Sequence, residues 1–402
     1  MATFVIKTVL QRAVRQTLMN TEQRFIIGFD AKRIMRNGTG LGSYGRTLIN
    51  ALAAEDASLE LRLYAPDEGN EALRTQLTTA DNIVPVYPQQ AHSALAKAWW
   101  RSKGVVKDLK RDGVTLFHGL SGELPLGIKA TGIRTVVTVH DLIFMRHPEF
   151  YHAWDVFIYI RKFRRMLKEA DRIVAISECT KRDIVELGGF PADRIDVIYQ
   201  SCGTRFKQPV SDVERQEVVK RYALPPRYML CVGTIEARKN VLLAVKALPH
   251  LLEDLHLVIL GRPTKYAETV KKWVEKHTLT SRVHFLHGVP NNDLPAIYRS
   301  AEVFVYPSRY EGFGLPIIEA IQSELPVVAC TGSCLEEAGG PDSLYVDPDD
   351  VEGLAHAVSR VLKSSDERSA RITRSLQYIR CFENSDIARR MLEEYERVHN
   401  DY

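Results

Sequence analysis

The sequence predicts an α/β protein built from two doubly wound domains, each a parallel sheet with helices on both faces. From Arg24 to about Tyr199, short β-branched runs alternate with helical patterns, which is typical of parallel strands joined by crossover helices. The same alternation starts again at Tyr228. With 402 residues, the chain also has the length of two domains of about 200 residues each.

Each domain has its own set of expected strands. In the first domain we expect strands at residues 25–29, 61–64, 83–86, 114–117, 135–139, 173–176 and 196–198. In the second domain we expect them at residues 228–232, 257–260, 283–286, 303–306, 327–329 and 344–346. From Asp349 onward the chain is expected to be mostly helical.

The expected domain limits follow from this pattern. They are an N-terminal extension (1–22), a first domain (23–205), a second domain (206–385) and a C-terminal helix that packs back on the first domain (386–402), with residues 200–209 as the linker. Ligands of such sheets bind beyond the carboxyl ends of the strands. We therefore expect an active site where the two domains face each other across a cleft, and domain closure as its conformational step.

The composition is that of an ordinary soluble protein, with 45% hydrophobic and 26% charged residues. The formal charge of +4 gives no support for a nucleic-acid partner. Six dispersed cysteines include no C-x-x-C pair, and Cys330 and Cys334 lack a second pair of ligands. We expect free thiols in a reducing compartment, without a zinc site.

The N-terminal segment is apolar in patches but is interrupted by basic residues, so it does not read as a signal peptide. No apolar run has the length needed to span a bilayer, and a cytoplasmic location is expected. Residues 1–20 fit two alternatives, a helix lying on an anionic membrane or an extra packing helix or frayed extension. The membrane alternative rests on one aliphatic stripe, formed by Ile6, Leu10, Val14 and Leu18.

Three early glycines, Gly40, Gly42 and Gly45, match the pattern G-x-G-x-x-G. Taken alone, this pattern indicates dinucleotide binding and an NAD(P)-dependent oxidoreductase. That fingerprint directly follows a strand, whereas here the strand ends near Phe29, about ten residues earlier. We expect instead a mobile glycine loop before a helix, which lets a substrate approach the backbone. A loop without any ligand is the remaining alternative.

A histidine, His140, follows the buried run 135–139 and is followed in turn by Asp141. The end of a parallel strand is where a side chain that faces the cleft belongs. A hydrogen-bonded structural histidine is the alternative to a catalytic one.

The segment 156–168 combines an apolar helical stripe with the strongest local positive charge of the chain. The stripe consists of Val156, Ile160, Phe163 and Leu167, and the cations outside it are Arg161, Lys162, Arg164, Arg165 and Lys168. Such a helix presents either a solvated face or a surface for anionic lipid or a lipid-linked phosphate acceptor.

Two adjacent cations, Arg238 and Lys239, follow the first strand of the second domain and its turn at Gly233. At the carboxyl end of that strand they have the position to neutralise a diphosphate leaving group, the role of a metal in other enzymes. A search for a metal site finds only the acidic run at 347–350. Asp349 or Asp350 is better explained as the cap of a helix that begins at Val351, so we expect no metal site.

The stretch 301–324 carries the most specific pattern of the chain. It predicts a buried strand (303–306), a loop opened by Glu311 and a helix entered at Pro316, which places Glu319 in the first turn. Backbone amides at such a helix N-terminus favour phosphate, and carboxylates accept hydrogen bonds from hydroxyls. The pattern therefore indicates a nucleotide sugar. The amides expected to face the phosphate are those of Gly312, Phe313, Gly314 and Leu315.

Together these motifs resemble the family 4 glycosyltransferases, retaining enzymes with two Rossmann-like domains in the GT-B arrangement. The shared features are the E-x7-E signature from Glu311 to Glu319 with the preceding Val305-Tyr-Pro-Ser308, the turn from Gly233 to Asn240, His140 and the glycine stretch at 39–44. The E-x7-E stretch is specific, whereas the glycine stretch is not. The resemblance runs from about Ile26 to the last helix.

The resemblance implies a role for each matching residue. Glu319 would bind the ribose hydroxyls of the donor nucleotide, and Glu311 would contact the donor sugar. Arg238 and Lys239 would hold the diphosphate, together with the amides of Gly314 and Leu315. His140 would reach the sugar, and Gly40 and Gly42 would border the acceptor. One departure is Thr234, because many members carry arginine directly after the glycine that matches Gly233. Charge compensation then depends more on Arg238 and Lys239.

The expected activity is transfer of a hexose from a nucleotide diphosphate sugar to a glycan or lipid-linked acceptor in surface polysaccharide synthesis. Mannose from GDP-mannose is the preferred donor, by resemblance to O-antigen and capsule enzymes. No metal or other cofactor is expected, and the enzyme is expected in the cytoplasm or on the inner face of the membrane. The alternatives are a nucleotide-sugar-binding protein without turnover and, from the glycine pattern, an NAD(P)-dependent oxidoreductase.

Overall fold

The structure is a computed structural model that describes residues 25–202, 204–362 and 367–400. It forms two compact units. Of the described residues, unit 1 comprises those within Met1–Thr138, Lys168–Arg172 and Leu392–Tyr402, and unit 2 comprises those within Val139–Leu167 and Ile173–Met391. The domain limits expected near residues 205 and 385 stay a prediction, and the helix expected within residues 1–20 lies outside the described residues.

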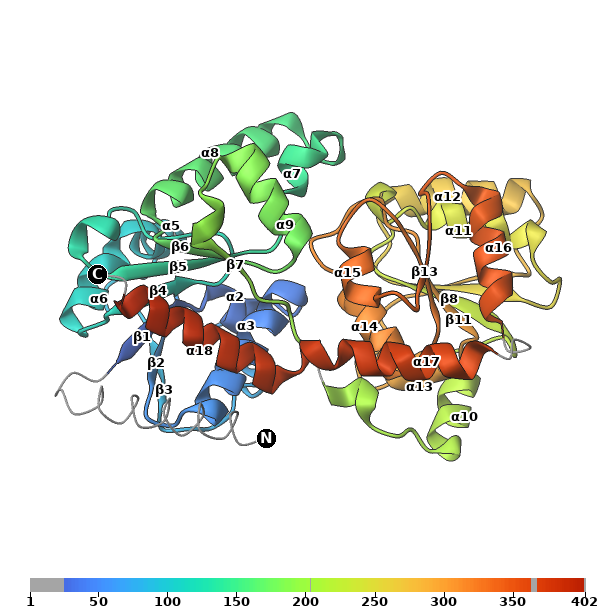
Figure 1. The fold of residues 1–402 in the computed structure, drawn as a ribbon, viewed down its shortest axis with the longest axis horizontal. Coiled ribbons are helices and arrows are strands. Elements are labelled where there is room, and N and C mark those ends of the chain that lie inside the picture. The colour runs from blue at the N-terminus through green and yellow to red at the C-terminus, as the bar shows by residue number, and fades with distance from the viewer. Residues whose placement is uncertain (1–24, 203, 363–366, 401–402) are drawn as a thin grey trace. The chain divides into compact units, whose positions relative to one another are not determined.

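Two separate parallel sheets were predicted, and two are present (Figure 1). The first has the strand order β3-β2-β1-β4-β5-β6-β7. Its strands are β1 (Ile26–Asp30), β2 (Glu60–Tyr64), β3 (Ile83–Val86), β4 (Leu116–Gly119), β5 (Arg134–Val139), β6 (Arg172–Ala175) and β7 (Ile195–Val197). Each expected strand of this sheet is therefore found, with ends shifted by two residues at most.

The second sheet has the order β10-β9-β8-β11-β12-β13. Its strands are β8 (Tyr228–Val232), β9 (His256–Leu260), β10 (Val283–Leu286), β11 (Val303–Tyr306), β12 (Val327–Cys330) and β13 (Leu344–Val346). β8 and β11 are neighbours in this order, with Val303 opposite Met229 and Phe304 opposite Leu230. The carboxyl ends of β8 and β11 therefore lie side by side, which brings the residues that follow them together.

The α-helices lie between these strands and, from α16 onward, after the last of them. They are α2 (Lys32–Arg36), α3 (Gly40–Glu55), α4 (Glu71–Arg74), α5 (Ala94–Trp99), α6 (Val105–Arg111), α7 (Ile143–Arg146), α8 (Ala153–Glu169), α9 (Glu178–Asp183), α10 (Asp212–Arg221), α11 (Val241–Ala247), α12 (Lys265–Lys276), α13 (Leu294–Ser300), α14 (Leu315–Gln322), α15 (Leu335–Gly339), α16 (Val351–Val361), α17 (Glu367–Tyr378) and α18 (Asn384–Asn400). No helix among the described residues is both long and apolar enough to cross a bilayer.

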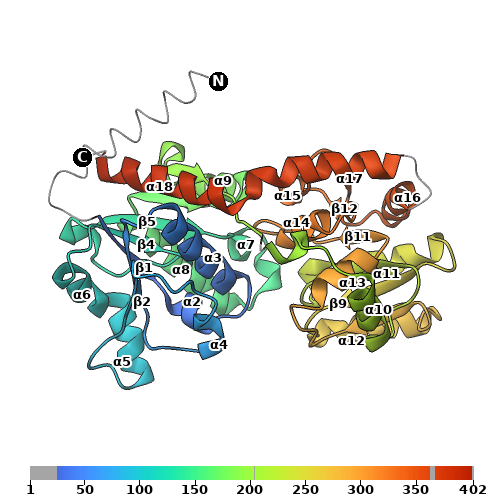
Figure 2. The ribbon, with the colours of Figure 1, turned by 90° about the horizontal axis from the view of Figure 1, so that it is seen from below.

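The second sheet has a separate hydrophobic core on each face, because successive side chains of a strand point to opposite sides. In β8, Tyr228 and Leu230 belong to one core, which they share with Ile317 of α14. Met229 and Cys231 belong to the other, which includes buried side chains of α11, α12 and α16. Figure 2 shows α14 and α11 near β11 in this part of the chain. The sheet is thus covered on both faces, as its almost uninterrupted apolar strands predict.

The glycines of the G-x-G-x-x-G pattern do not form the loop that was predicted. They lie in the first two turns of α3, and α2 intervenes between β1 and α3. A Cβ atom at Gly42 would lie 1.8 Å from the carbonyl oxygen of Asn37, and one at Gly45 would lie 2.7 Å from Cγ1 of Ile34. These two glycines therefore allow α3 to approach α2 closely, and the strand-to-helix turn of a dinucleotide site is missing at this position.

Two further segments make buried side-chain contacts. Phe206, within the segment expected to be a linker, is 1% exposed and packs edge-on against Tyr298. In unit 1, the Tyr395 hydroxyl of α18 lies 2.6 Å from Nδ1 of His118, a residue of β4. All six cysteines are free thiols, and Cys381 is exposed.

Candidate active site

A buried ion cluster lies at the carboxyl ends of β8 and β11. Nζ of Lys239 is 2.6 Å from Oε1 of Glu311, and Nη1 of Arg238 is 2.8 Å from Oε2 of the same carboxylate. Both cations come from the short 3-10 helix Ala237–Lys239, which follows β8, and Glu311 comes from the loop after β11. The neighbouring strands thus bring Glu311 to two cations that lie more than 70 residues earlier in the sequence.

The cluster is charged at neutral pH. Burial alone would raise the pKa of Glu311, but the positive charges of Lys239 and Arg238 outweigh burial and lower that pKa to about 2. Burial likewise opposes the charged forms of Lys239 and Arg238, yet the Glu311 carboxylate raises the pKa of both. Glu236 also pairs with Arg238 (2.7 Å), so two carboxylates share the cluster with two cations, and Lys239 and Arg238 supply the positive charges that an incoming anion would meet.

Tyr306, the last residue of β11, holds Lys239 in place. Nζ of Lys239 donates a hydrogen bond to the Tyr306 hydroxyl (2.6 Å) and lies 4.9 Å from the centre of its ring. Burial, followed by the nearby Glu311 carboxylate, raises the pKa of Tyr306 to about 12, so the phenol is neutral. Tyr306 was predicted only as the end of a strand and as part of the motif Val305–Ser308, without a role of its own, although its place at the carboxyl end of that strand was a usable signal.

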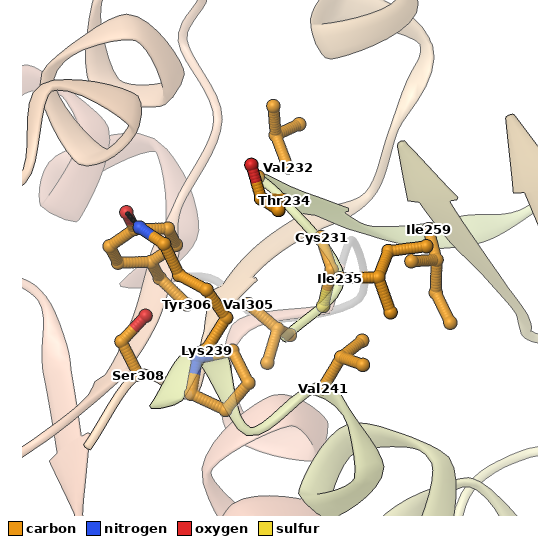
Figure 3. A pocket seen from close by; sticks show the side chains of 12 residues that line it. Cys231, Val232, Thr234, Ile235, Lys239, Val241, Ile259, Val305, Tyr306 and Ser308 are labelled. Carbon is orange, nitrogen blue, oxygen red and sulfur yellow. Dashed lines mark hydrogen bonds between the residues drawn. The ribbon is translucent and has the colours of Figure 1, made fainter. Parts of the chain in front are cut away.

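A small pocket lies beside this cluster (Figure 3). Lys239, Tyr306 and Ser308 line it together with the turn at Gly233 and Thr234. The Ser308 hydroxyl is fully buried and has no hydrogen-bond partner within the described part of the chain. In Figure 3 the Lys239 side chain extends toward the Tyr306 hydroxyl. Thr234, which stands where many family members have arginine, thus lines the same pocket as Lys239.

The loop after Glu311 is held by close backbone contacts that only glycine allows. A Cβ atom at Gly312 would lie 2.1 Å from the carbonyl oxygen of His140. The Ser177 hydroxyl donates a hydrogen bond to the carbonyl oxygen of Gly312 (2.8 Å). Gly314 has a φ of 146°, which side chains rarely adopt, and precedes α14 as its N-cap. The loop is therefore fixed between the residues around His140 and the start of α14.

This conformation leaves a run of backbone amides without partners. In the part of the chain that the structure describes, the amides of Gly312, Phe313, Gly314 and Leu315 donate no hydrogen bond. Pro316 comes next and has no amide hydrogen. Free amides and the positive end of the α14 dipole both favour an anion at this position.

Glu319 lies one residue further along α14 than predicted. The helix begins at Leu315 rather than at Pro316, and Glu319 is its fifth residue, so it occupies the second turn. Its Oε2 accepts a hydrogen bond from the Tyr298 hydroxyl of α13 (2.9 Å). Burial raises the pKa of Glu319. The two glutamates of the E-x7-E pattern therefore differ sharply, since two cations neutralise Glu311 and a phenol hydroxyl contacts Glu319.

His140 follows β5 directly, as predicted, and lies beside the glycine loop in the same compact unit. Its Nδ1 atom is 2.7 Å from Nε2 of Gln200, which is 6% exposed. Gln200 was expected to belong to the linker and was not predicted as a site residue. Its signal was the same as that of His140, because it follows a strand, β7, of the same sheet.

The remaining predicted sites are placed as follows. The carboxylate of Asp350 caps α16, accepting a hydrogen bond from the amide of Gly353 (2.8 Å), which confirms the predicted capping role. Asp349 pairs with Arg309. Among the described residues, no three acidic, histidine or cysteine side chains gather as a metal site would require. Gly40 and Gly42 belong to α3 in unit 1.

Two family models match most of the chain. The model described as Glycosyltransferase Family 4 covers residues 38–202, and that described as Glycosyl transferases group 1 covers residues 212–377. The chain is 30% identical over 371 residues to O-antigen chain mannosyltransferase B of Escherichia coli, which covers 86% of this chain and 92% of the relative. It is 26% identical over 337 residues to O-antigen chain mannosyltransferase RfbU of Salmonella typhimurium, with 82% and 89% covered.

Solved structures show the same fold. A glycosyltransferase from Rickettsia africae aligns with a TM-score of 0.72 at 17% identity, covering 95% of this chain and 100% of that one. HepE from Anabaena, solved with UDP-glucose, aligns with a TM-score of 0.70 at 16% identity, covering 93% and 100%. The predicted GT-B fold is thus confirmed, and the chain belongs to the family 4 glycosyltransferases.

Proposed function

We propose that this glycosyltransferase moves mannose from GDP-mannose to a glycan or lipid-linked acceptor in surface polysaccharide synthesis. The relatives from Escherichia coli and Salmonella typhimurium are both O-antigen chain mannosyltransferases, and the chain aligns with most of the length of each. The observation that carries the proposal is the ion cluster of Arg238, Lys239 and Glu311 beside four free amides. This arrangement suits a diphosphate joined to a sugar.

The cations are proposed to stabilise the leaving group. As the bond between the sugar and the diphosphate breaks, negative charge develops on the phosphate oxygen. Lys239 and Arg238 are held by Glu311, and Tyr306 fixes Lys239 further, so the positive charge is in position before the reaction starts. Since two cations supply this charge, the proposed reaction needs no bound metal or other cofactor.

The donor is proposed to bind along the loop and the start of α14. The amides of Gly312, Phe313, Gly314 and Leu315 would receive phosphate oxygens, and the Glu319 carboxylate would accept hydrogen bonds from the ribose hydroxyls. Glu311 and His140 would contact the sugar. Gly40 and Gly42, which lie in the first turn of α3, would border the acceptor.

Retention of configuration is proposed to occur by attack on the same face of the sugar. The bond from the anomeric carbon to the diphosphate breaks, the acceptor hydroxyl forms the new bond, and the leaving phosphate takes the proton of that hydroxyl. This route requires no nucleophilic side chain. We also propose that the protein works at the inner face of the membrane, as a peripheral protein.

The direct test is a donor screen that measures released nucleoside diphosphate. Several nucleotide sugars are offered with and without an acceptor extract, and GDP release that requires both GDP-mannose and acceptor is expected. Binding of GDP-mannose without any release would support the alternative of a protein without turnover. Binding of NAD(P), measured by calorimetry, would favour the oxidoreductase, whose characteristic turn is missing at Gly40–Gly45.

A further inference from the structure

We infer that the outer face of α8 is a binding surface for an anionic lipid bilayer, through which the protein docks on a membrane. The inference makes the peripheral location proposed above specific, and it is tested without donor or acceptor. The surface consists of two aromatic residues followed by four cations: Trp154, Phe157, Arg161, Arg164, Arg165 and Lys168. We call it the α8 face.

These residues lie on one side of the helix. Counted from Trp154, Phe157 is three residues further along the chain, Arg161 seven and Arg165 eleven. Residues at these spacings lie on the same side of an α-helix. The opposite side faces the protein interior, where Phe163 and Met166 are buried. Phe163 and Phe144 of α7 pack edge-on, which fixes the rotation of α8.

The aromatic end of the α8 face is unusually exposed for large apolar side chains. Trp154 is 71% exposed and Phe157 is 55% exposed, and their rings stack with centres 5.6 Å apart. A soluble protein gains nothing by presenting such a pair to water, so the pair indicates an apolar or interfacial partner. Tryptophan in particular prefers the boundary between lipid headgroups and acyl chains.

The cationic end carries no compensating negative charge. Arg161, Arg164, Arg165 and Lys168 are exposed, and within the described chain none of them forms an ion pair or hydrogen bond. Glu169 is turned inward, where its carboxylate accepts hydrogen bonds from the amides of Gly127 and Lys129 (both 3.1 Å). Asp155, the other acid of α8, is half-buried and follows Trp154 directly, which places it off this face.

The combination of aromatics and cations favours a bilayer over other anionic partners. A helix lying in the membrane interface inserts its aromatics at the headgroup boundary while its cations meet anionic headgroups. Each cation near such a surface strengthens binding about fivefold. A polyanion such as a nucleic acid would use the four cations but would leave the exposed Trp154–Phe157 pair without an apolar environment.

The test measures binding of the full chain to vesicles of phosphatidylglycerol with phosphatidylcholine, and to phosphatidylcholine alone, by co-sedimentation at low salt. We expect binding only to the anionic vesicles. The variant Arg161→Glu/Arg165→Glu should weaken this binding at least about 25-fold, since two attractive charges are lost and two repulsive ones are gained. Trp154→Ser/Phe157→Ser should weaken it by about tenfold or more through the loss of apolar insertion.

Two matched variants serve as controls. Lys272→Glu/Lys276→Glu reverses two exposed cations of α12, and Leu252→Ser removes an apolar side chain that is 53% exposed, so both should bind like the wild type. Trp154 emission should also shift to shorter wavelength on the vesicles, and Trp154→Phe should remove that shift while keeping most of the binding. Transfer to a soluble acceptor should be unchanged in all of these variants, because the α8 face contains no residue of the proposed active site.

Several outcomes would overturn the inference. Equal binding of the wild type to both kinds of vesicle would do so, as would unchanged binding of both α8 variants. The surface would be purely electrostatic if the wild type bound a soluble polyanion such as heparin as tightly as the anionic vesicles, and if Trp154→Ser/Phe157→Ser bound heparin equally well. A failure of this kind leaves the transfer reaction untouched, and a protein without transferase activity could still pass the vesicle test.

Discussion

Two glycine-containing stretches of this chain look alike in sequence but differ in what the glycines do. In α3, Gly42 and Gly45 serve helix packing, since a side chain at either position would collide with α2. In the loop before α14, Gly312 allows the backbone to lie against His140, and Gly314 adopts a φ of 146° that side chains rarely allow. Together they give a loop with four free amides. The first stretch builds the scaffold, and the second exposes backbone donors.

The difference lies in what surrounds each stretch. The loop before α14 is adjacent to Glu311, which joins two cations, and is followed by a proline and a second carboxylate. The start of α3 has no acidic residue in its first turn, and the nearby Arg46 donates its hydrogen bonds to the carbonyl oxygens of Ile34 (2.8 Å) and Asn37 (3.0 Å). A glycine pattern therefore indicates a phosphate site only together with charged neighbours and a helix that starts at the loop.

The largest effect is expected from disrupting the ion cluster of Lys239, Arg238 and Glu311, which lies beside the loop before α14 and has no counterpart at α3 among the described residues. Lys239→Ala should lower transfer by about 10²-fold to 10³-fold, because a preorganised cation no longer meets the leaving diphosphate. Glu311→Ala should likewise abolish transfer while the fold persists. The measurement is nucleoside diphosphate release with acceptor, with far-ultraviolet circular dichroism as the check on folding.

Lys246→Ala is the matched control, because this exposed lysine of α11 lies outside the cluster. It should retain wild-type activity. Full activity of both Lys239→Ala and Glu311→Ala would refute the assigned site.

Gly312→Ala tests whether the second stretch depends on close backbone approach. The added Cβ atom would lie 2.1 Å from the carbonyl oxygen of His140, so the loop must move. A displacement of about 1 Å at a reacting group costs roughly 10²-fold in rate. We expect a loss of transfer of that size with nearly normal thermal stability, measured by activity assay and melting temperature. An active Gly312→Ala enzyme would show that the loop tolerates rearrangement.

Gly42→Ala makes the corresponding change in the first stretch and should affect stability. Its Cβ atom would lie 1.8 Å from the backbone oxygen of Asn37, and the separation of α2 and α3 must increase. Such overpacking costs about 1–3 kcal/mol of the free energy of unfolding. Urea denaturation should show the corresponding fall in midpoint. If stability were unchanged while transfer was lost, Gly42 would act on the acceptor rather than in packing.

Glu319→Gln separates the two carboxylates by their response to pH. Burial raises the pKa of Glu319 in the folded protein above its value in the unfolded chain, so its ionisation opposes folding. This cost is absent below the unfolded pKa and complete above the folded one. The melting temperature of Glu319→Gln should therefore exceed that of the wild type by more at pH 8 than at pH 4. A difference that shrinks as pH rises would contradict the burial of this carboxylate.

Gly40→Ala should have the smallest effect. No atom lies within 4 Å of the position that its Cβ atom would take, and alanine favours helix over glycine by up to about 1 kcal/mol. We expect a slight rise in the urea midpoint and normal transfer. A marked loss of transfer would show that the acceptor approaches this position closely.

The strands were the most predictable part of the fold, and the glycines of α3 were the least. Parallel strands that are buried on both faces appear in the sequence as short, nearly continuous apolar runs, such as Val303–Tyr306. Gly40, Gly42 and Gly45 lower the helical signal, and contact with α2 explains Gly42 and Gly45 but not Gly40. The start of α14 was misplaced by one residue because Gly314, with its φ of 146°, acts as the N-cap.

The candidate site was predictable where residues follow strands and not where they contact one another. Glu311, Arg238 and Lys239 each lie at the carboxyl end of a strand, a position that the alternating pattern reveals. That one carboxylate joins both cations depends on the order of β8 and β11 in the sheet, which the sequence does not specify. Gln200 was missed for a similar reason, since its partner His140 is distant in the chain.

The hydroxyl of Ser177 has a consequence for attempts to redesign the donor site. It caps α9 by accepting a hydrogen bond from the amide of Thr180 (3.0 Å), and it also donates a hydrogen bond to the carbonyl oxygen of Gly312 (2.8 Å). The conformation of the segment from Glu311 to Glu319 therefore depends on residues outside that segment. A donor loop transplanted from another enzyme would need matching partners at Ser177 and His140, more than 130 residues earlier in the chain.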